Sequence, residues 1–366
     1  MSHREIRLAI LPGDGIGPEV IRESVRVLDT ISKLDRDLSI AKTYFDWGSE
    51  RYLKQGSMMP GDALEQLQRG KFDAILLGPV GDPRIPDHVT LWGLLLPIRQ
   101  HFDQYVNLRP MRLLQGVDSP LRNSTEIDMV CVRENTEGEY AGVGGRVHAG
   151  KRADLAIQSV VFTRTGTERI IRFAFEWART HGRKRVTSAT KSNSMQHNMV
   201  FWDEIFREIA REYPEISTDQ QLIDSFTARM VQSPQSVDVF VGSNLFGDIL
   251  SDLGAAVTGS LGLAPSANIN PERNYPSLFQ AVHGTAPDIA GKGIANPIAS
   301  IWSLQLMFDF LGEDRWAGSL MKAIEEVLRE RTCRTPDLGG KHSTTDLGVA
   351  ICEALTAATG LASAAS

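Results

Sequence analysis

Short apolar runs alternate with amphipathic stretches along most of the chain. Residues 7–11 and 72–78 are almost continuously apolar, which is typical of buried strands. After Pro18, apolar side chains beginning with Val20 and Ile21 recur at the spacing of a helix. Further strands are predicted over 106–111, 128–133, 185–189, 221–224 and 237–241, and helices over 168–180, 199–212, 245–257, 297–311 and 316–331. This alternation predicts an α/β fold with helices on both faces of the sheet.

Residues 138–163 interrupt the alternation. Their first half is rich in glycine, and the second half contains the β-prone residues Ile157, Val160, Val161 and Phe162 without a helical period. The segment is interpreted as a hairpin or protruding arm, which in a dimer could pair across the interface. An ordinary surface loop fits the same pattern, so both interpretations stay open.

Composition narrows the class of protein. The chain has 366 residues, 42% of them hydrophobic, and 39 basic against 45 acidic residues give a net charge of −6. This length predicts about two domains, and the absence of a basic block argues against nucleic-acid binding. The most apolar stretch, 91–98, is too short to span a membrane, and the first residues do not resemble a signal peptide. Three widely spaced cysteines form no metal or disulfide motif. A cytoplasmic protein is therefore expected.

A glycine loop lies between the first strand and the first helix. Backbone N–H groups at a helix N-terminus suit anionic ligands, and Gly13, Gly15 and Gly17 would let a ligand approach the backbone. Pro18 breaks the dinucleotide pattern G-x-G-x-x-G, and no Walker lysine follows. The loop is either a ligand loop of another kind or a tight structural turn.

Two carboxylates share one face of a predicted helix. Asp248 and Asp252 are four residues apart among apolar neighbours, where like charges destabilise a helix unless something offsets them. A hard divalent cation would do so, with Asp224, at the end of a predicted strand, as a further ligand. A solvated polar face or a helix cap is the alternative.

Three arginines are candidates for anion recognition. Arg99, Arg109 and Arg133 lie at the ends of predicted elements, and arginine forks bind carboxylates in a bidentate manner. Together they could hold a small dicarboxylate, although each one alone would also fit a surface salt bridge.

Lys191 closes an apolar strand, where ligands of open α/β sheets collect, and Tyr140 is considered with it. Burial beside a carboxylate could tune the lysine for proton transfer. A solvent-facing lysine at a strand end is the alternative.

The segment from His283 to Asn296 is a long loop of small residues before a helix. Asp288 could accept hydrogen bonds from ribose hydroxyls, and it would repel a 2′-phosphate, which favours NAD over NADP. An irregular connection without a ligand is the alternative.

The sequences of these motifs and their order along the chain resemble those of one protein family. The motifs are LPGDGIGPE at 11–19, NLRP at 107–110, NLFGDILSD at 244–252, HGTAPD at 283–288 and TPDLGG at 335–340. They are similar to those of the β-decarboxylating dehydrogenases, the family of isocitrate and 3-isopropylmalate dehydrogenases. FDWG at 45–48, PDHVTLWG at 86–93, FDQYVN at 102–107 and RENTEGEY at 133–140 resemble its tartrate dehydrogenase/D-malate dehydrogenase (decarboxylating) branch. The residues before Arg99 lack the serine of the isocitrate enzymes.

The resemblance implies a two-lobed isocitrate/isopropylmalate dehydrogenase-like fold rather than the common Rossmann domain. Residues 1–104 and 262–366 would form a discontinuous cofactor-binding lobe. Residues 105–261 would form the dimerisation and substrate/metal lobe, with an arm at about 138–163. The family site takes residues from both subunits, so a homodimer with shared active sites is expected, and a tetramer stays open.

The resemblance also implies a role for each motif residue. Arg99, Arg109, Arg133 and Asn193 would bind substrate; Tyr140, Lys191 and Asp224 would be catalytic; Asp224, Asp248 and Asp252 would bind metal; Gly13, Gly15, Ile16, His283, Gly284, Ala286, Asp288 and Asn296 would bind the cofactor. Lys191 and Asp224 would come from the other subunit. Lys191 would act as the general base, and Tyr140 would deliver a proton to carbon.

The implied reaction is oxidation of a small 2-hydroxy dicarboxylate by NAD with Mn²⁺ or Mg²⁺; K⁺ is a further candidate ion. D-malate would give pyruvate and CO₂ by hydride transfer followed by β-decarboxylation, and tartrates are alternative substrates. Two departures lie on the expected cofactor side: Gln280-Ala281 replaces the usual Glu-Pro, and Pro79 replaces an alanine. The alternatives are a 3-isopropylmalate dehydrogenase, a non-catalytic subunit on the same fold, and a two-lobed solute-binding protein.

Overall fold

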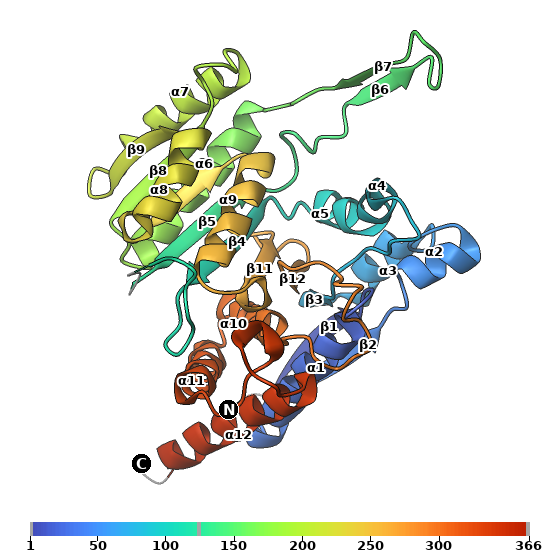
Figure 1. Cartoon of the computed structure of the whole chain (residues 1–366), viewed down its shortest axis with the longest axis vertical. Coiled ribbons are helices and arrows are strands. Elements are labelled where there is room, and N and C mark those ends of the chain that lie inside the picture. The colour runs from blue at the N-terminus through green and yellow to red at the C-terminus, as the bar shows by residue number, and fades with distance from the viewer. Residues whose placement is uncertain (1–2, 123–125, 364–366) are drawn as a thin grey trace. The chain divides into compact units, whose positions relative to one another are not determined.

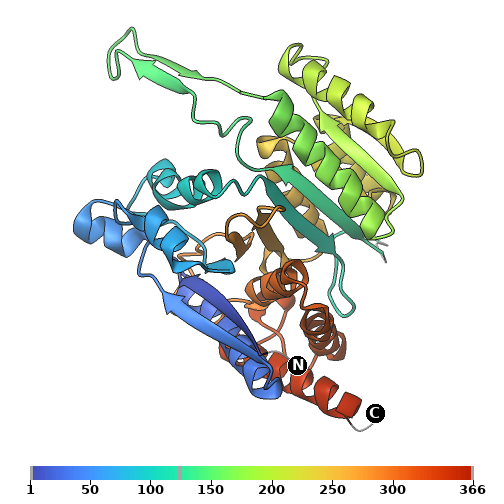
Figure 2. The same ribbon diagram turned by 180° about the vertical axis from the view of Figure 1, so that it is seen from behind.

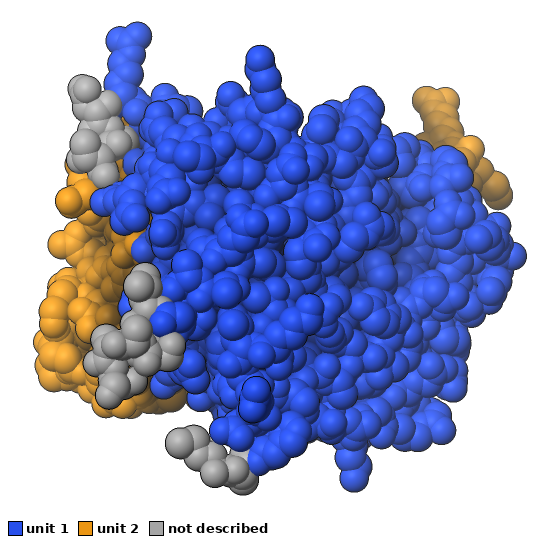
Figure 3. All heavy atoms as spheres, turned by 90° about the horizontal axis from the view of Figure 1, so that it is seen from below, with its two compact units in different colours: residues 1–104, 113–122, 255–366 blue, residues 105–112, 123–254 orange. Residues whose placement is uncertain are grey.

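The computed structural model describes residues 3–122 and 126–363. The chain forms two compact units, which Figure 3 distinguishes by colour. Unit 1 comprises Met1–Gln104, Leu113–Arg122 and Ala255–Ser366, and unit 2 comprises Tyr105–Arg112 and Asn123–Gly254.

Unit 1 is built around strand β1, Arg4–Leu11, which pairs in parallel with a strand on each side. The strand order is β2-β1-β3-β12-β11, and β11 alone is antiparallel to its neighbour β12. These strands are β2 Leu38–Tyr44, β3 Ala74–Leu77, β11 Pro265–Ile269 and β12 Ser277–Ala281. The helices are α1 Gly17–Leu34, α2 Ser49–Gln55, α3 Ala63–Gly70, α10 Ile298–Leu311, α11 Asp314–Glu330 and α12 Thr344–Ser363. Short 3₁₀ turns cover Leu261–Leu263 and Pro336–Leu338.

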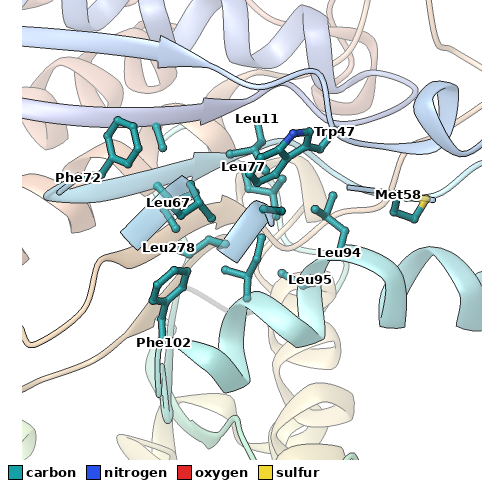
Figure 4. Packing of buried hydrophobic residues seen from close by; sticks show 14 residues of the cluster. Leu11, Trp47, Met58, Leu67, Phe72, Leu77, Leu94, Leu95, Phe102 and Leu278 are labelled. Atoms are coloured by element: carbon teal, nitrogen blue, oxygen red, sulfur yellow. The ribbon is translucent and has the colours of Figure 1, made fainter. Parts of the chain in front are cut away.

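The core of unit 1 is dense in aromatic and branched side chains. Phe102 and Leu278 meet Leu67 and Leu77 beneath β3, and Trp47 closes the same cluster (Figure 4). Burying a side chain of this kind contributes about 1.5–3 kcal/mol, so the cluster stabilises the packing of helices on this sheet.

A helical segment of unit 1 contains one π turn. It runs through α4 Asp87–Thr90, the π turn Leu91–Leu95 and α5 Leu96–His101. Pro97 has no N–H, and its ring would clash with the carbonyl of Gly93 in a regular α-helix. The wider turn removes this conflict, and the N–H of Leu96 bonds to the carbonyl of Leu91 instead.

Unit 2 has the strand order β4-β5-β10-β8-β9. The strands β5, β10, β8 and β9 are parallel, whereas β4 is antiparallel to β5. Their bounds are β4 Val106–Arg112, β5 Asp128–Glu134, β8 Arg185–Thr190, β9 Ser217–Leu222 and β10 Val239–Gly242. The helices are α6 Arg164–Thr180, α7 Asn198–Ala210, α8 Ile223–Gln232 and α9 Asn244–Val257, with a 3₁₀ turn at Pro234–Ser236. Figure 1 shows α8 and α9 on one face of this sheet, and Figure 2 shows α6 on the other.

A two-stranded hairpin extends from the body of unit 2 (Figures 1 and 2). Its strands, β6 Gly144–Val147 and β7 Leu155–Gln158, are antiparallel, and each of their residues is exposed. The bridge between Gly138 and Val161 closes its base, and the apolar side chains Val147 and Ile157 are 51% and 57% exposed. Pairing of this arm with a second copy of the chain stays a prediction.

The units differ from the predicted lobes at two places. Residues 113–122 and 255–261 cluster with unit 1 rather than with unit 2. Arg331 donates a hydrogen bond to Asp118 at 2.8 Å, and Ser119 donates one to the carbonyl of Val257 at 2.7 Å, both within unit 1. The predicted lobe boundaries were placed from motif positions, which give no information about these polar contacts.

One predicted strand is wrong. The segment 221–224 is not a strand of its own, because β9 ends at Leu222 and α8 begins at Ile223. The edge strand β9 reads STDQQL and has no apolar alternation that would reveal it. Asp224 therefore lies in the first turn of a helix, where the helix dipole favours a carboxylate.

No helix within 3–122 or 126–363 combines the length and the apolar character needed to cross a membrane. Helix α10 is buried over most of its surface because it packs on β11, β12 and α11.

The buried ring of Phe102 tests the core of unit 1. We expect Phe102→Ala to lower the free energy of unfolding by about 3–5 kcal/mol, because it removes an aromatic side chain from a filled cluster. Leu53→Ala, at a side chain that is 43% exposed on α2, serves as the control and should cost less than about 1 kcal/mol. Urea denaturation followed by circular dichroism measures both; equal midpoints for the two variants would contradict the assignment of this core.

Candidate functional site

The parallel strands of unit 2 bring four polar segments to one edge of the sheet. Arg133 lies at the end of β5, α9 begins directly after β10, Lys191 follows β8, and Asp224 follows β9. The carboxyl ends of parallel strands point the same way, and ligands of open α/β sheets collect there.

Arg109 and Arg133 lie on the same face of this sheet. In the β4–β5 ladder Arg109 is opposite Cys131, and Asn107 is opposite Arg133. Directly opposed residues share a face, as do residues two apart in a strand, so the two guanidinium groups are diagonal neighbours. Both arginines are buried.

Helix α9 passes very close to β5. A Cβ atom at Gly247 would come within 2.6 Å of the Cβ of Arg133, so only glycine allows this approach. The thiol of Cys131 lies 3.6 Å from the carbonyl oxygen of Gly247, and burial raises the pKa of this thiol to about 12. Cys131 is therefore an inert packing residue.

The guanidinium of Arg133 is neutralised beneath α9. Its Nε and Nη2 donate to Oδ1 of Asn244 at 3.2 and 2.7 Å, and its Nη1 pairs with Asp248. The guanidinium carbon lies 5.6 Å from the centre of the Tyr140 ring. A buried charge is tolerated only with such partners.

Arg109 joins the two carboxylates of α9. Its Nη1 lies 3.3 Å from Oδ1 of Asp248 and 3.6 Å from Oδ1 of Asp252, and it donates to the hydroxyl of Ser251 at 2.7 Å. Burial, together with the charge of Arg133, lowers the pKa of Arg109, while burial raises the pKa of Asp252. Asp248 and Asp252, which were predicted to share one helix face, thus both lie close to Nη1 of Arg109.

The hydroxyl of Tyr140 donates to Oδ2 of Asp248 at 3.3 Å. Burial and the charge of Asp248 raise the pKa of Tyr140 above its ordinary value. The phenol is therefore protonated at neutral pH and available as a proton donor.

Lys191 and Asp224 form a second polar group of unit 2. Nζ of Lys191 donates to Oδ1 of Asp224 at 2.6 Å, and this hydrogen bond lowers the pKa of the carboxyl group. The register of β8 and β9 explains the contact, because Thr190 is paired with Leu222 and both residues follow shortly after. Asn193, the nearby predicted substrate ligand, is exposed and accepts a hydrogen bond from Ser194 at 3.4 Å.

The pair Asp248 and Asp252 fits a hard cation. Their oxygens already converge on the Nη1 of Arg109, a positive group, and carboxylate oxygens are the ligands that Mg²⁺ and Mn²⁺ prefer. Among residues 3–122 and 126–363 of a single chain, no three His, Cys, Asp or Glu side chains form a metal cluster. A complete site therefore needs oxygens from substrate, water or another copy of the chain.

In unit 1, Asp14 organises the glycine loop. Its carboxylate accepts hydrogen bonds from the N–H and hydroxyl of Ser49 at 2.8 and 2.6 Å, and from the N–H of Gly81 at 2.9 Å. Gly13 and Gly15 have φ values of 73° and 58°, and a Cβ at either position would clash with backbone oxygens. The N–H of Ile16 bonds to the carbonyl of Thr285, so this loop and the His283 segment are joined.

The His283–Asn296 loop has polar groups that suit a dinucleotide. Burial lowers the pKa of His283, which keeps the ring neutral, and its Nε2 is buried with no protein partner among the described residues. Asn296 is buried and donates to Asp337 at 3.0 Å, whereas Gly284 and Asp288 are exposed. Ala286 has a φ of 42°, a conformation that side chains rarely adopt. An unpaired buried nitrogen beside exposed backbone fits a ligand-binding loop.

Arg99, the third predicted substrate arginine, belongs to unit 1. It is buried on α5, two residues after Pro97. The structure thus places Arg109, Arg133, Tyr140, Asp248 and Asp252 together, Lys191 with Asp224, and the cofactor residues in unit 1.

Sequence reasoning missed several residues that support the site. Asn244 holds Arg133, Ser251 holds Arg109, and Ser49 holds Asp14. Asn244 and Ser251 lie inside the motif NLFGDILSD, which was the available signal, whereas Ser49 carries no motif that assigns it to Asp14.

Comparison with known proteins gives consistent matches over nearly the whole chain. Residues 7–351 match the model of the isocitrate/isopropylmalate dehydrogenase family. The chain is 51% identical over 354 residues to a probable tartrate dehydrogenase/decarboxylase of Agrobacterium vitis, covering 96% of this chain and 98% of that protein. It is 51% identical over 359 residues to the D-malate dehydrogenase [decarboxylating] of Escherichia coli, covering 96% and 98%. The crystal structure of isocitrate dehydrogenase from Methylococcus capsulatus matches with a TM-score of 0.85 at 37% identity, covering 96% and 99%.

Glu134, the residue after Arg133 in the motif RENTEGEY, is a buried acid to which the resemblance assigns no role. Its carboxylate accepts hydrogen bonds from the N–H groups of Thr136 and Glu137 at 2.8 and 3.0 Å, and from the hydroxyl of Thr136. Burial outweighs these bonds and raises its pKa from 4.5 to about 7. Glu134 shapes the turn that leads from β5 toward Tyr140.

The raised pKa of Glu134 makes stability depend on pH. Because the folded pKa exceeds the unfolded one, the group stabilises the fold below pH 4.5, and this contribution is lost as the pH rises toward 7. We expect Glu134→Gln, which mimics the protonated acid, to gain stability relative to the wild type on the order of 2 kcal/mol at pH 8. The gain should shrink toward pH 5. Thermal unfolding at both pH values measures it; a difference that does not change with pH would contradict the shift.

Proposed function

The chain belongs to the isocitrate/isopropylmalate dehydrogenase family, and from this premise we propose that it oxidises and decarboxylates a small 2-hydroxy dicarboxylate with NAD and a divalent metal ion. D-malate, giving pyruvate and CO₂, and the tartrates are the proposed substrates. Relatives that are about half identical over their full length are named as tartrate and D-malate dehydrogenases. The observation that carries the proposal is the convergence of Arg109 and Arg133 on Asp248 and Asp252, because it combines anion recognition with cation ligands.

The arginines would bind the two substrate carboxylates. Arg109 and Arg133 supply adjacent guanidinium groups, and Arg99 would supply a third from unit 1. Arginine keeps its charge when buried and matches carboxylates in a planar, bidentate way. Asn244 accepts a hydrogen bond from the guanidinium of Arg133, and Ser251 accepts one from that of Arg109, so both groups are oriented without substrate.

Asp248 and Asp252, with Asp224, would hold Mn²⁺ or Mg²⁺, whose Lewis acidity would polarise the C2 hydroxyl and the adjacent carboxylate. Hydride from C2 would pass to the nicotinamide of NAD, and the unit 1 loops around Asp14 and His283 would bind that cofactor. The exposed carboxylate of Asp288 suits ribose hydroxyls and disfavours a 2′-phosphate, so NAD is proposed over NADP.

Proton transfers fall to two residues of unit 2. Lys191, held by Asp224, would take the proton of the substrate hydroxyl as hydride leaves. Tyr140, kept protonated by burial, would give a proton to the carbon from which CO₂ has departed. Lys191 pairs with Asp224 rather than with the Asp248 group within the chain. We propose that a homodimer completes each site with these two residues from the partner copy.

Turnover and metal dependence test the proposal directly. We expect D-malate or a tartrate to reduce NAD in the presence of Mn²⁺, with EDTA abolishing the reaction and added Mn²⁺ restoring it, because the carboxylate pair requires a cation. Absorbance at 340 nm and assays for pyruvate and CO₂ measure it. Equal or faster turnover of 3-isopropylmalate would overturn the substrate while keeping the family. No turnover with any 2-hydroxy acid would favour a non-catalytic subunit.

Removing the proposed base tests the role of Lys191. We expect Lys191→Ala to lower kcat about 10²–10⁴-fold, the usual contribution of a general base, while NAD still binds in calorimetry. Lys184→Ala removes an exposed lysine at the opposite end of β8 and should leave kcat unchanged. Retention of wild-type kcat by Lys191→Ala would remove the assigned role.

A further inference from the structure

Helix α9 and the residue before it contact the chain between β5 and β6 at three residues, Glu137, Glu139 and Tyr140. Asn244 donates from Nδ2 to the carbonyl of Glu137 at 3.2 Å, the Glu139 carboxylate is bonded to the first turn of α9, and the hydroxyl of Tyr140 reaches Asp248. Beyond Tyr140 the chain continues into the exposed strands β6 and β7, so Glu139 is the last acid bonded to the body of unit 2 before those strands.

Glu139 makes two well-formed hydrogen bonds. Its Oε1 accepts from the hydroxyl of Ser243 at 2.8 Å, and its Oε2 accepts from the N–H of Leu245 at 3.0 Å. The N–H of Leu245 belongs to the first turn of α9 and has no acceptor within the helix. A carboxylate satisfies such a donor and also interacts favourably with the positive end of the helix dipole.

Tyr140 itself is held more weakly. Its hydroxyl has a long hydrogen bond of 3.3 Å to Asp248, and its ring lies 5.6 Å from the guanidinium carbon of Arg133. The preceding Gly138 has a φ of 73° and bonds to Val161 at the base of the arm. The two hydrogen bonds of Glu139, one residue away, are shorter than the single hydrogen bond of the Tyr140 hydroxyl.

We propose that Glu139 is a positioning residue, which holds the hydroxyl of Tyr140 at Asp248 by anchoring its own carboxylate on the first turn of α9. The role rests on the proposed function, in which Tyr140 donates the final proton. Glu139 touches neither the reacting atoms nor a metal ligand directly, and it acts through the backbone it shares with Tyr140.

Three substitutions of Glu139 distinguish the effect of its position from the effect of its charge. Glu139→Ala removes both hydrogen bonds. Glu139→Asp keeps the charge but withdraws the carboxylate by one methylene. Glu139→Gln keeps both contacts, because its amide oxygen can accept from Leu245 while its amide nitrogen donates to the hydroxyl of Ser243. Glu215→Ala, at an exposed glutamate of unit 2, is the matched control.

We expect Glu139→Ala and Glu139→Asp to lower kcat about 10–100-fold, with the KM values for NAD and Mn²⁺ within threefold of the wild type. Glu139→Gln and Glu215→Ala should stay within threefold in kcat. In a Tyr140→Phe background, Glu139→Ala should cost no further activity, because the group it positions is already gone. An additive loss in that background, or a rise in the KM for Mn²⁺ that accounts for the whole effect, would overturn the proposal in favour of a general role in folding α9.

The position of the Tyr140 ring can also be measured without turnover. In protein labelled with 3-fluorotyrosine, the ¹⁹F resonance of Tyr140 is assigned as the one lost in Tyr140→Phe. We expect Glu139→Ala and Glu139→Asp to shift it, and Glu139→Gln and Glu215→Ala to leave it in place. An unmoved resonance in Glu139→Ala would refute the positioning role even if the wild type is active. Absence of turnover in the wild type would refute the proposed function alone.

Discussion

The burial of the Arg133 guanidinium beneath α9 is the constraint on which the rest of the unit 2 site depends. An unpaired charge in that position would cost several kcal/mol, so its neighbours are arranged to neutralise it. Asn244 takes two of its N–H groups and Asp248 takes another, and Gly247 provides the space for the side chain to pass. The close approach of helix and strand and the residues at the start of α9 fit the burial of this cation, and Asp248 pairs with both Arg133 and the neighbouring buried Arg109.

The same helix connects recognition with chemistry. Asp248 contacts Arg133, Arg109 and Tyr140, so a change at any of these groups alters the electrostatic surroundings of the others. Such networks act as units, because partners in a low-dielectric site polarise one another and cannot be removed singly without leaving an unsatisfied group. In unit 1 the carboxylate of Asp14 has a comparable organising position, since it joins its own loop to the first residue of α2 and to Gly81.

Much of this arrangement was predictable from local patterns. The helix expected over 245–257 is confirmed as α9, and the spacing of Asp248 and Asp252 places both on one side of it. Arg109 and Arg133 were expected on or beside strands and are found in β4 and β5. Asp224 was expected at a strand end and instead begins a helix, because the polar edge strand β9 has no hydrophobic period to mark its end. The support given by Ser49 to Asp14 could not be predicted, because hydrogen bonds between segments far apart in the chain have no period in the sequence.

The sequence by itself determined the family, the α/β class and the identity of the candidate site residues. Motif sequences and hydrophobic periodicity can each be recognised within a short stretch of the chain. Only the tertiary structure decided which of those residues act on one another. Strand register placed Arg109 beside Arg133, the missing Cβ of Gly247 brought α9 onto β5, and the first turn of α9 fixed the chain that carries Glu139 and Tyr140. The contact of Glu139 with Leu245 joins residues 106 positions apart, and the free energy that selects such contacts comes from burying charge and satisfying polar groups together.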